Sequence, residues 1–110
     1  MLENVAVDSI EINEYLGAFI GSELIFECEL ILTYFVRISQ EKGKWVTEVT
    51  FHDLKSSFVG DQIFNSDEEV YSCILILEEK GYLTIERKTG ENDIIKVTEK
   101  FAELCEKYAQ

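Results

Sequence analysis

The fold is decided by the stretch LEEKGYLTIER at residues 77–87. Its start continues the apolar spacing of a helix, and Gly81 is a typical residue for ending one. Apolar and polar residues then alternate over residues 82–87 and again over 93–97, as they do in half-buried strands. Gly90, between these two runs, can adopt the positive φ that a hairpin turn requires. The stretch therefore predicts a helix that leads directly into a β-hairpin.

Two capping signals predict helices before the hairpin. Residues 50–53, Thr-Phe-His-Asp, resemble a capping box with Asp in fourth place and predict a short helix to about Phe58. Residues 66–69, Ser-Asp-Glu-Glu, form a full capping box and predict a helix to Lys80. The connection between the two helices, residues 60–65, is longer than the tight turn of a DNA-binding helix-turn-helix.

The remaining elements are predicted from apolar spacing and end signals. A first helix is expected over residues 9–20 and a longer one over 22–42, each opened by a serine. Gly43 ends the longer helix, and residues 45–47, Trp-Val-Thr, are typical of a short strand. Thr98 is placed to cap a last helix.

This order of elements is that of a winged helix-turn-helix with extra N-terminal helices. The fold class is therefore mainly α with a small β-hairpin wing. A chain of 110 residues is long enough for one core, so we expect a single domain over residues 1–110. Within it we distinguish the N-terminal helices (1–43), the winged-helix core (44–98) and the C-terminal helix (99–110).

The same residues also resemble MarR-type and PadR-type regulators. In those proteins a Leu-Glu-x-Lys-Gly turn ends the recognition helix before the wing, and residues 77–81 have this pattern. Their next helix starts with Thr-Glu-x-Gly; Thr98 and Glu99 match, whereas Phe101 stands where Gly is frequent. The resemblance covers roughly residues 45–104.

The resemblance implies that residues 66–80 form a helix that enters the major groove of DNA, with a wing tip at 87–93. The side chains depart from that pattern, because base-reading helices use mainly Arg, Lys, Asn, Gln, Ser and Thr near their start. This helix opens with three acids, and Tyr71 and Leu75 lie on the face away from the predicted core. Either the N-terminal helices cover that face or it forms an apolar patch with an acidic rim.

The charge of the chain is unusual for a DNA-binding protein. It carries 22 acidic and 10 basic residues, a net charge of -12, and residues 1–36 hold seven acids and no Lys or Arg. Such a surface repels phosphate, although acidity can also serve only to keep the protein soluble.

We therefore expect a non-enzymatic, acidic winged-helix protein that acts by protein–protein binding, as a regulator, adaptor or inhibitor. Its extreme form is a mobile-element protein whose acidic face imitates DNA. The expected protein-binding residues are Asp67, Glu68, Tyr71, Leu75 and Ile76. The alternative is a homodimeric MarR/PadR-like DNA-binding transcriptional regulator that uses Lys55, Arg87, Lys88 and Lys96.

The helix over residues 22–42 is apolar on more of its surface than one small domain is expected to cover. This predicts a homodimer whose contact lies on the main apolar stripe, formed by Leu24, Cys28, Ile31 and Phe35. Residues 15–36 are long enough to span a bilayer, but they contain three glutamates, so we expect no membrane segment.

Little in the sequence indicates catalysis. His52 is the only histidine, and no nucleophile elbow, Gly-rich phosphate loop or metal-ligand spacing is present, so we expect no enzyme activity, cofactor or metal. The three cysteines are widely spaced on apolar stripes, which predicts buried, reduced thiols. No basic region follows Met1, so we expect no signal peptide and a cytoplasmic location.

Overall fold

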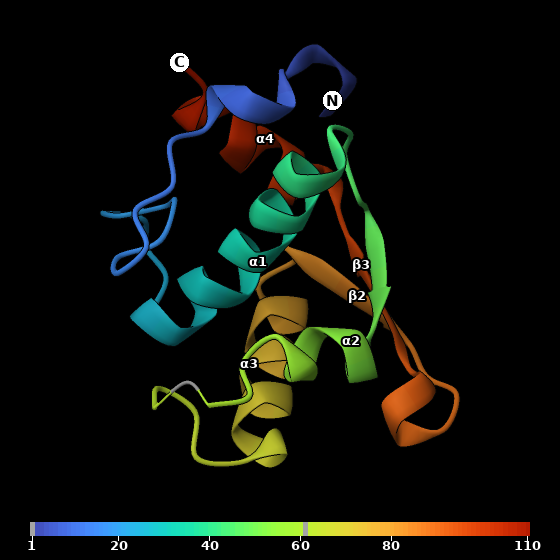
Figure 1. Ribbon diagram of the computed structural model, residues 1–110. Coiled ribbons are helices and arrows are strands. Elements are labelled where there is room, and N and C mark those ends of the chain that lie inside the picture. The colour runs from blue at the N-terminus through green and yellow to red at the C-terminus, as the bar shows by residue number, and fades with distance from the viewer. Residues whose placement is uncertain (1, 61) are drawn as a thin grey trace.

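The chain forms a mainly α fold with a small antiparallel sheet, as predicted (Figure 1). The computed structural model describes residues 2–60 and 62–110. Two short 3-10 helices come first, and the order helix, strand, helix, helix, hairpin, helix of a winged helix follows. The elements are η1 (Leu2–Asn4), η2 (Val7–Ser9), α1 (Phe26–Lys42), β1 (Glu48–Thr50), α2 (Phe51–Ser56), α3 (Asp67–Glu79), β2 (Leu83–Glu86), η3 (Gly90–Asn92), β3 (Ile94–Val97) and α4 (Glu99–Tyr108).

The sheet has the strand order β1-β3-β2, with both pairs antiparallel. β2 and β3 are the predicted hairpin, and Gly90 in its turn has a φ of 52°. The predicted strand covered residues 45–47, whereas β1 begins three residues later, at Glu48, which pairs with Lys96 of β3. Of the predicted residues, Thr47 still bonds to the sheet, because its carbonyl accepts the Val97 N–H at 2.9 Å. The other two bond elsewhere: the Trp45 indole N–H donates to the Val5 carbonyl (2.8 Å), and the Val46 N–H donates to Ser39 Oγ (2.9 Å).

Both predicted helix caps before the hairpin are confirmed. Thr50 Oγ1 accepts the Asp53 N–H at 3.1 Å, and Ser66 Oγ accepts the Glu69 N–H at 3.3 Å. In a capping box the Glu69 carboxylate would accept the N–H of Ser66. Here it accepts the N–H of the preceding residue, Asn65, at 2.7 Å. α2 is two residues shorter than predicted. The predicted connection over residues 60–65 includes position 61, which lies outside the described residues.

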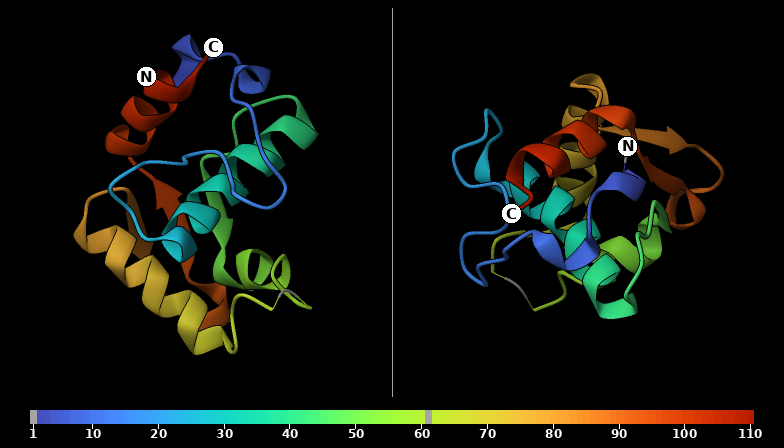
Figure 2. Two further views of the ribbon diagram at one scale, coloured as in Figure 1. Left: turned by 90° about the vertical axis from the view of Figure 1, so that its left-hand side faces the viewer. Right: turned by 90° about the horizontal axis from the view of Figure 1, so that it is seen from above.

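The predicted helix over residues 9–20 is wrong. The Asn13 side chain accepts the N–H groups of Tyr15 (2.9 Å) and Leu16 (3.2 Å), which favours a turn over a helix. Gly17 and Gly21 follow with φ of 82° and 87°, values that a right-handed helix excludes. The segment therefore runs as an irregular chain across α1 (Figure 2).

The second predicted helix begins later than expected. α1 starts at Phe26 instead of Ser22, and its N-cap Ile25 makes no side-chain capping bond. Ser22 Oγ accepts the Leu24 N–H at 3.3 Å, so the serine stabilises a turn before α1 and does not cap the helix. The predicted end is confirmed, because Gly43 closes the helix with a φ of 70°.

One hydrophobic core includes side chains from the N-terminal segment, every α-helix and the hairpin. Its aromatic centre is Phe101 of α4, which is fully buried. The ring of Phe101 meets Phe19, Phe35 and Trp45 edge-on, with centroid distances of 6.1–6.4 Å. This packing ties the N-terminal segment, α1 and α4 together and leaves the sheet and α3 on the other side of α1 (Figure 1).

Candidate protein-binding face on helix α3

The outward face of α3 is the surface that the sequence singles out for binding. α3 buries Val70, Cys73, Ile74 and Leu77 against the rest of the chain. Helical spacing turns Glu68, Leu75 and Glu79 to the opposite side, and all three are exposed. We call this surface the α3 face; with its half-buried margins it consists of Asp67, Glu68, Tyr71, Ser72, Leu75, Ile76, Glu78 and Glu79.

The N-terminal residues do not cover the α3 face as one reading of the sequence allowed. Leu75 at its centre is 41% exposed, whereas Tyr71 and Ile76 beside it are half-buried. An isolated exposed leucine is ordinary on a protein surface. Here the leucine lies one helical turn after Tyr71, which lines a hollow together with Asp67 and Glu68.

A shallow hollow of about 370 Å³ lies at the start of the α3 face. It is lined by Phe51 of α2 and by Asp67, Glu68, Tyr71 and Ser72 of α3. Three of the five predicted protein-binding residues therefore meet at one depression. The remaining two, Leu75 and Ile76, follow one turn later along the helix.

Tyr71 has a structural role as well as a place on this face. Its ring packs edge-on against Phe51 with centroids 5.0 Å apart, and its hydroxyl donates to Asp93 Oδ2 at 3.0 Å. Asp93 is 5% exposed and also accepts the Lys88 N–H at 2.7 Å. Burial, together with the bond to Asp93, raises the pKa of Tyr71, so the phenol stays a donor. Nothing in the sequence around Asp93 indicated this link between α3 and the wing.

Two of the four candidate DNA-binding residues are held by acids of the α3 face. Lys55 Nζ lies 2.9 Å from Asp67 Oδ2 and also pairs with Glu91 of the hairpin turn. Arg87 donates through both terminal nitrogens to Glu78, at 2.9 and 3.2 Å. This forked pair lowers the pKa of Glu78, because the guanidinium stabilises the charged carboxylate.

The other two candidates lie along the hairpin and are also near acids. Lys96 Nζ is 3.2 Å from Glu86 Oε2 and 4.0 Å from Glu48 Oε2. Lys88 Nζ is 3.9 Å from Glu86 Oε1. The structure therefore places all four predicted DNA-binding residues in ion pairs within the chain and does not gather them on one free surface.

Glu78 and Glu79 are members of the α3 face that the sequence-based prediction missed. Glu79 could have been found, because it follows Leu75 at the i+4 spacing that defines a helix face. The forked contact of Glu78 with Arg87 could not, since it joins residues on different elements.

The residues predicted to form the dimer contact are buried inside the single chain, so this part of the prediction is wrong. Leu24 is 7% exposed, and Cys28, Ile31 and Phe35 are fully buried within the single chain. The N-terminal segment, α3 and α4 supply the cover that a partner chain was expected to give. These four residues form the core of this molecule and are not available to a second copy.

The remaining features concern metal-binding clusters, cysteines and the length of the helices. No cluster of His, Cys, Asp and Glu among residues 2–60 and 62–110 could hold a metal ion. The three cysteines are free and buried, as predicted, and Cys28 Sγ donates to the Cys73 carbonyl at 3.9 Å. Over the same described part of the chain, no helix combines the length and the apolar character needed to cross a bilayer.

Comparison with known proteins adds no relative. No family model matches the chain, and neither the curated proteins nor the solved structures include a match. The likeness of residues 77–81 to MarR and PadR regulators stays a resemblance of motif and element order.

Proposed function

We propose that the chain is a non-enzymatic, acidic winged-helix protein that acts by binding another protein through the α3 face. One observation carries the proposal. Two bases from other elements, Lys55 and Arg87, are paired with its acids Asp67 and Glu78. What the face offers to a partner is an exposed leucine between further carboxylates.

This arrangement opposes binding to duplex DNA. Affinity for the phosphate backbone comes from Lys and Arg that replace counterions, and each candidate base lies within 4 Å of a carboxylate that competes with phosphate for it. The net charge of -12 adds a long-range repulsion that slows association. A helix that presents Glu68 and Glu79 to a groove would place acids against phosphates.

The partner that fits the α3 face is a protein with an apolar contact surrounded by Lys or Arg. Leu75 can bury its side chain there, and the acids around it can pair with the basic rim. We expect the chain to act on such a partner as a regulator, adaptor or inhibitor. The DNA-imitating protein of a mobile element is the extreme member of this class.

The second candidate is a homodimeric DNA-binding regulator of the MarR/PadR kind. The observation in its favour is the order from α1 to β3, with residues 77–81 forming the turn before the wing. A homodimer stays a prediction for either candidate, and sedimentation at micromolar concentration tests it. A cytoplasmic location is likewise part of the proposal.

The first experiment is a mobility-shift assay with a random duplex library at about 150 mM salt. The proposal expects no retained sequence. Selection of a palindromic duplex, lost when both Arg87 and Lys88 are replaced by alanine, would overturn it and favour the regulator.

The second experiment compares the proteins captured by the native chain and by variants of the α3 face. Leu75→Ala and Glu68→Lys should each lose the captured partner, because they remove the apolar contact and reverse one rim charge. Glu103→Lys is the matched control, since it makes the same charge change on the exposed side of α4. Equal loss with the control would mean that total charge, and not the α3 face, decides binding.

A further inference from the structure

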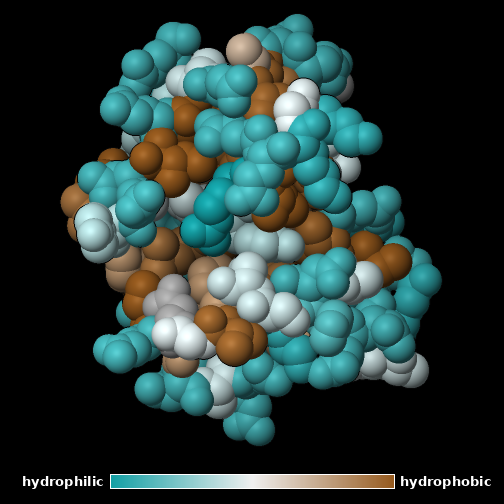
Figure 3. Space-filling view, in the orientation of Figure 1, coloured by the Kyte–Doolittle hydropathy of each residue, from teal (hydrophilic) through white to brown (hydrophobic). Residues whose placement is uncertain are grey.

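Five of the seven large hydrophobic side chains that are exposed in the described part of the chain lie within residues 15–26, separate from the α3 face. Tyr15 is 82% exposed, and Leu16, Ile20 and Ile25 are each at least half exposed, followed by Phe26 at 37%. In Figure 3, hydrophobic side chains gather on the side of the molecule where Figure 1 shows this segment. We call residues 12–26 the N-terminal loop surface. The α3 face offers only Leu75 by comparison.

The tip of this loop is a preformed turn. Asn13 accepts the N–H groups of Tyr15 and Leu16 through its side chain, and its carbonyl accepts the Gly17 N–H at 2.9 Å. Gly17 has a φ of 82°, and a Cβ atom there would lie 3.0 Å from Thr33 Oγ1. The backbone of the turn is thus determined by its own bonds, while most of the Tyr15 side chain and half of the Leu16 side chain are exposed.

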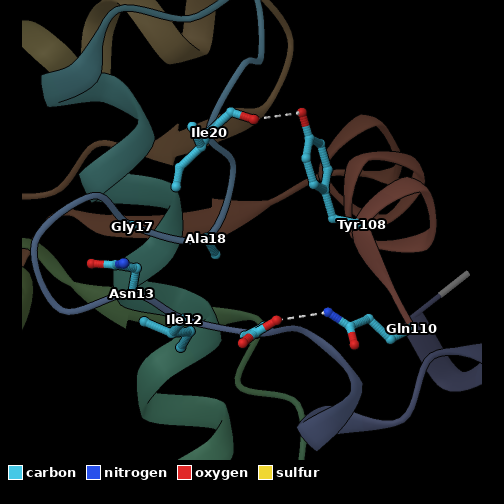
Figure 4. Close-up of a pocket in the computed structure, with 8 residues that line it drawn as sticks. Ile12, Asn13, Gly17, Ala18, Ile20, Tyr108 and Gln110 are labelled. Atoms are coloured by element: carbon cyan, nitrogen blue, oxygen red, sulfur yellow. Dashed lines mark hydrogen bonds between the residues drawn. The ribbon is translucent and has the colours of Figure 1, made fainter.

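The base of the loop is attached to the core at several points. The Ala18 N–H donates to Thr33 Oγ1 of α1 at 3.0 Å, and the Tyr108 hydroxyl donates to the Ile20 carbonyl at 3.3 Å. Figure 4 shows Tyr108 reaching Ile20 of the loop, and the Gln110 amide reaching Glu11 just before the loop at 2.9 Å, beside a hollow of about 340 Å³. A loop held in this way loses little conformational freedom when it binds, which favours affinity.

A second hollow, of about 360 Å³, lies beside the tip of the loop. Tyr15 and Glu14 form one side of it, and Leu30 of α1 and Phe58, just after α2, line it deeper in. An apolar side chain of a partner could therefore enter next to Tyr15. Aromatic side chains beside a pocket are the usual centres of protein–protein contacts.

The charge around this surface selects the partner. Residues 1–36 contain seven acids and no base, and Glu11, Glu14 and Glu23 are exposed near the apolar side chains. The hollow beside Tyr15 is also lined by a base, the exposed Arg37 of α1, so the acids of the loop outnumber the base that faces them. A second copy of the chain would bring like charges together, which opposes self-association through this surface. A segment that carries Lys or Arg around apolar residues complements it.

We propose that the N-terminal loop surface binds a cationic amphipathic segment of another protein, with Tyr15 and Leu16 as the apolar anchors. The exposed carboxylates of the loop pair with the basic residues of that segment. This surface is a second binding site and does not depend on the α3 face, so either proposal can fail without the other.

The test uses a synthetic amphipathic peptide in which Leu and Lys are placed at helical spacing, and a control peptide with Glu in place of Lys. Amide resonances of the full chain should shift on addition of the Lys peptide, and the shifts should concentrate in residues 12–26. Replacing Tyr15 and Leu16 together with alanine should weaken binding about tenfold, because both anchors are lost. Leu75→Ala is the matched control and should leave this affinity unchanged.

Three results would overturn the proposal. The resonance shifts could spread over all acidic surfaces of the chain. The double variant could also bind the Lys peptide as tightly as the native chain. Either result would mean that general charge attraction alone explains binding. The native chain could also sediment as a dimer that the double variant dissociates, which would make this surface a contact between two copies. Both replaced side chains are exposed, so the variants should remain folded, and their thermal unfolding checks this.

Discussion

Replacing Tyr71 with phenylalanine tests the bond that joins α3 to the wing. The change removes one hydroxyl and keeps the ring that packs against Phe51. It leaves Oδ2 of the buried Asp93 without the donor that lies 3.0 Å away. A hydrogen bond to a charged group contributes about 1.5–3 kcal/mol. Tyr71 is only half-buried, so water can replace part of the bond, and we expect a loss of about 1–2 kcal/mol in the free energy of unfolding.

Urea unfolding followed by tryptophan fluorescence measures this loss. Trp45 is the only tryptophan, and its ring lies against Phe101 in the core, so its emission reports on global unfolding. The midpoint should fall while the denaturant slope stays constant, because the same surface is exposed on unfolding. Tyr15→Phe is the matched control; with Tyr15 82% exposed, its effect should stay within about 0.5 kcal/mol. Equal midpoints for the two variants would refute the proposed role of the hydroxyl.

Three further changes test other parts of the molecule. Ser66→Ala removes the cap of α3 and should cost about 1 kcal/mol in urea unfolding; an unchanged midpoint would mean that the cap contributes nothing. Burial raises the pKa of the Glu29 carboxyl, and a hydrogen bond from Ser22 partly opposes this. The charged carboxylate therefore lowers the free energy of unfolding at a pH where the carboxyl is ionised. Glu29→Gln should therefore raise the thermal midpoint at pH 7, and the gain should vanish below the ordinary carboxyl pKa; a gain that persists in acid would contradict this cause. Burial raises the pKa of Cys105 to about 12, so this thiol should resist a thiol reagent at pH 8 until the chain unfolds, and rapid labelling of the native protein would show that it is accessible.

Several elements could be predicted from the sequence because their causes are local. The hydroxyls of Thr50 and Ser66 lie three residues before the N–H groups that they accept, so the residue types alone place the starts of α2 and α3. The hairpin follows from alternation on both sides of Gly90. Gly43 ends α1 by adopting a conformation that other residues avoid.

The N-terminal segment could not be predicted in this way. Its apolar residues have helical spacing, but Phe19 is buried through contacts with Phe101 and Tyr108, which lie at the other end of the chain. Those contacts, together with the turn that Asn13 and Gly17 form, stabilise an irregular path. Apolar spacing shows that side chains will be buried and does not show which distant residues bury them.

Two properties on which the proposed function depends are decided by the tertiary structure. The sequence alone determined the winged-helix order, the excess of acids and the acidic start of α3, because each is a property of composition or of neighbouring residues. Only the folded chain decided that α1 is covered by its own N-terminal segment, so that Phe35 and its neighbours are core and not an interface. It also brought Lys55 to Asp67 and Arg87 to Glu78, so that these two bases are paired with acids of the α3 face. Ion pairs of this kind depend on the packing of separate elements, and no local pattern in the sequence encodes the distance between their charges.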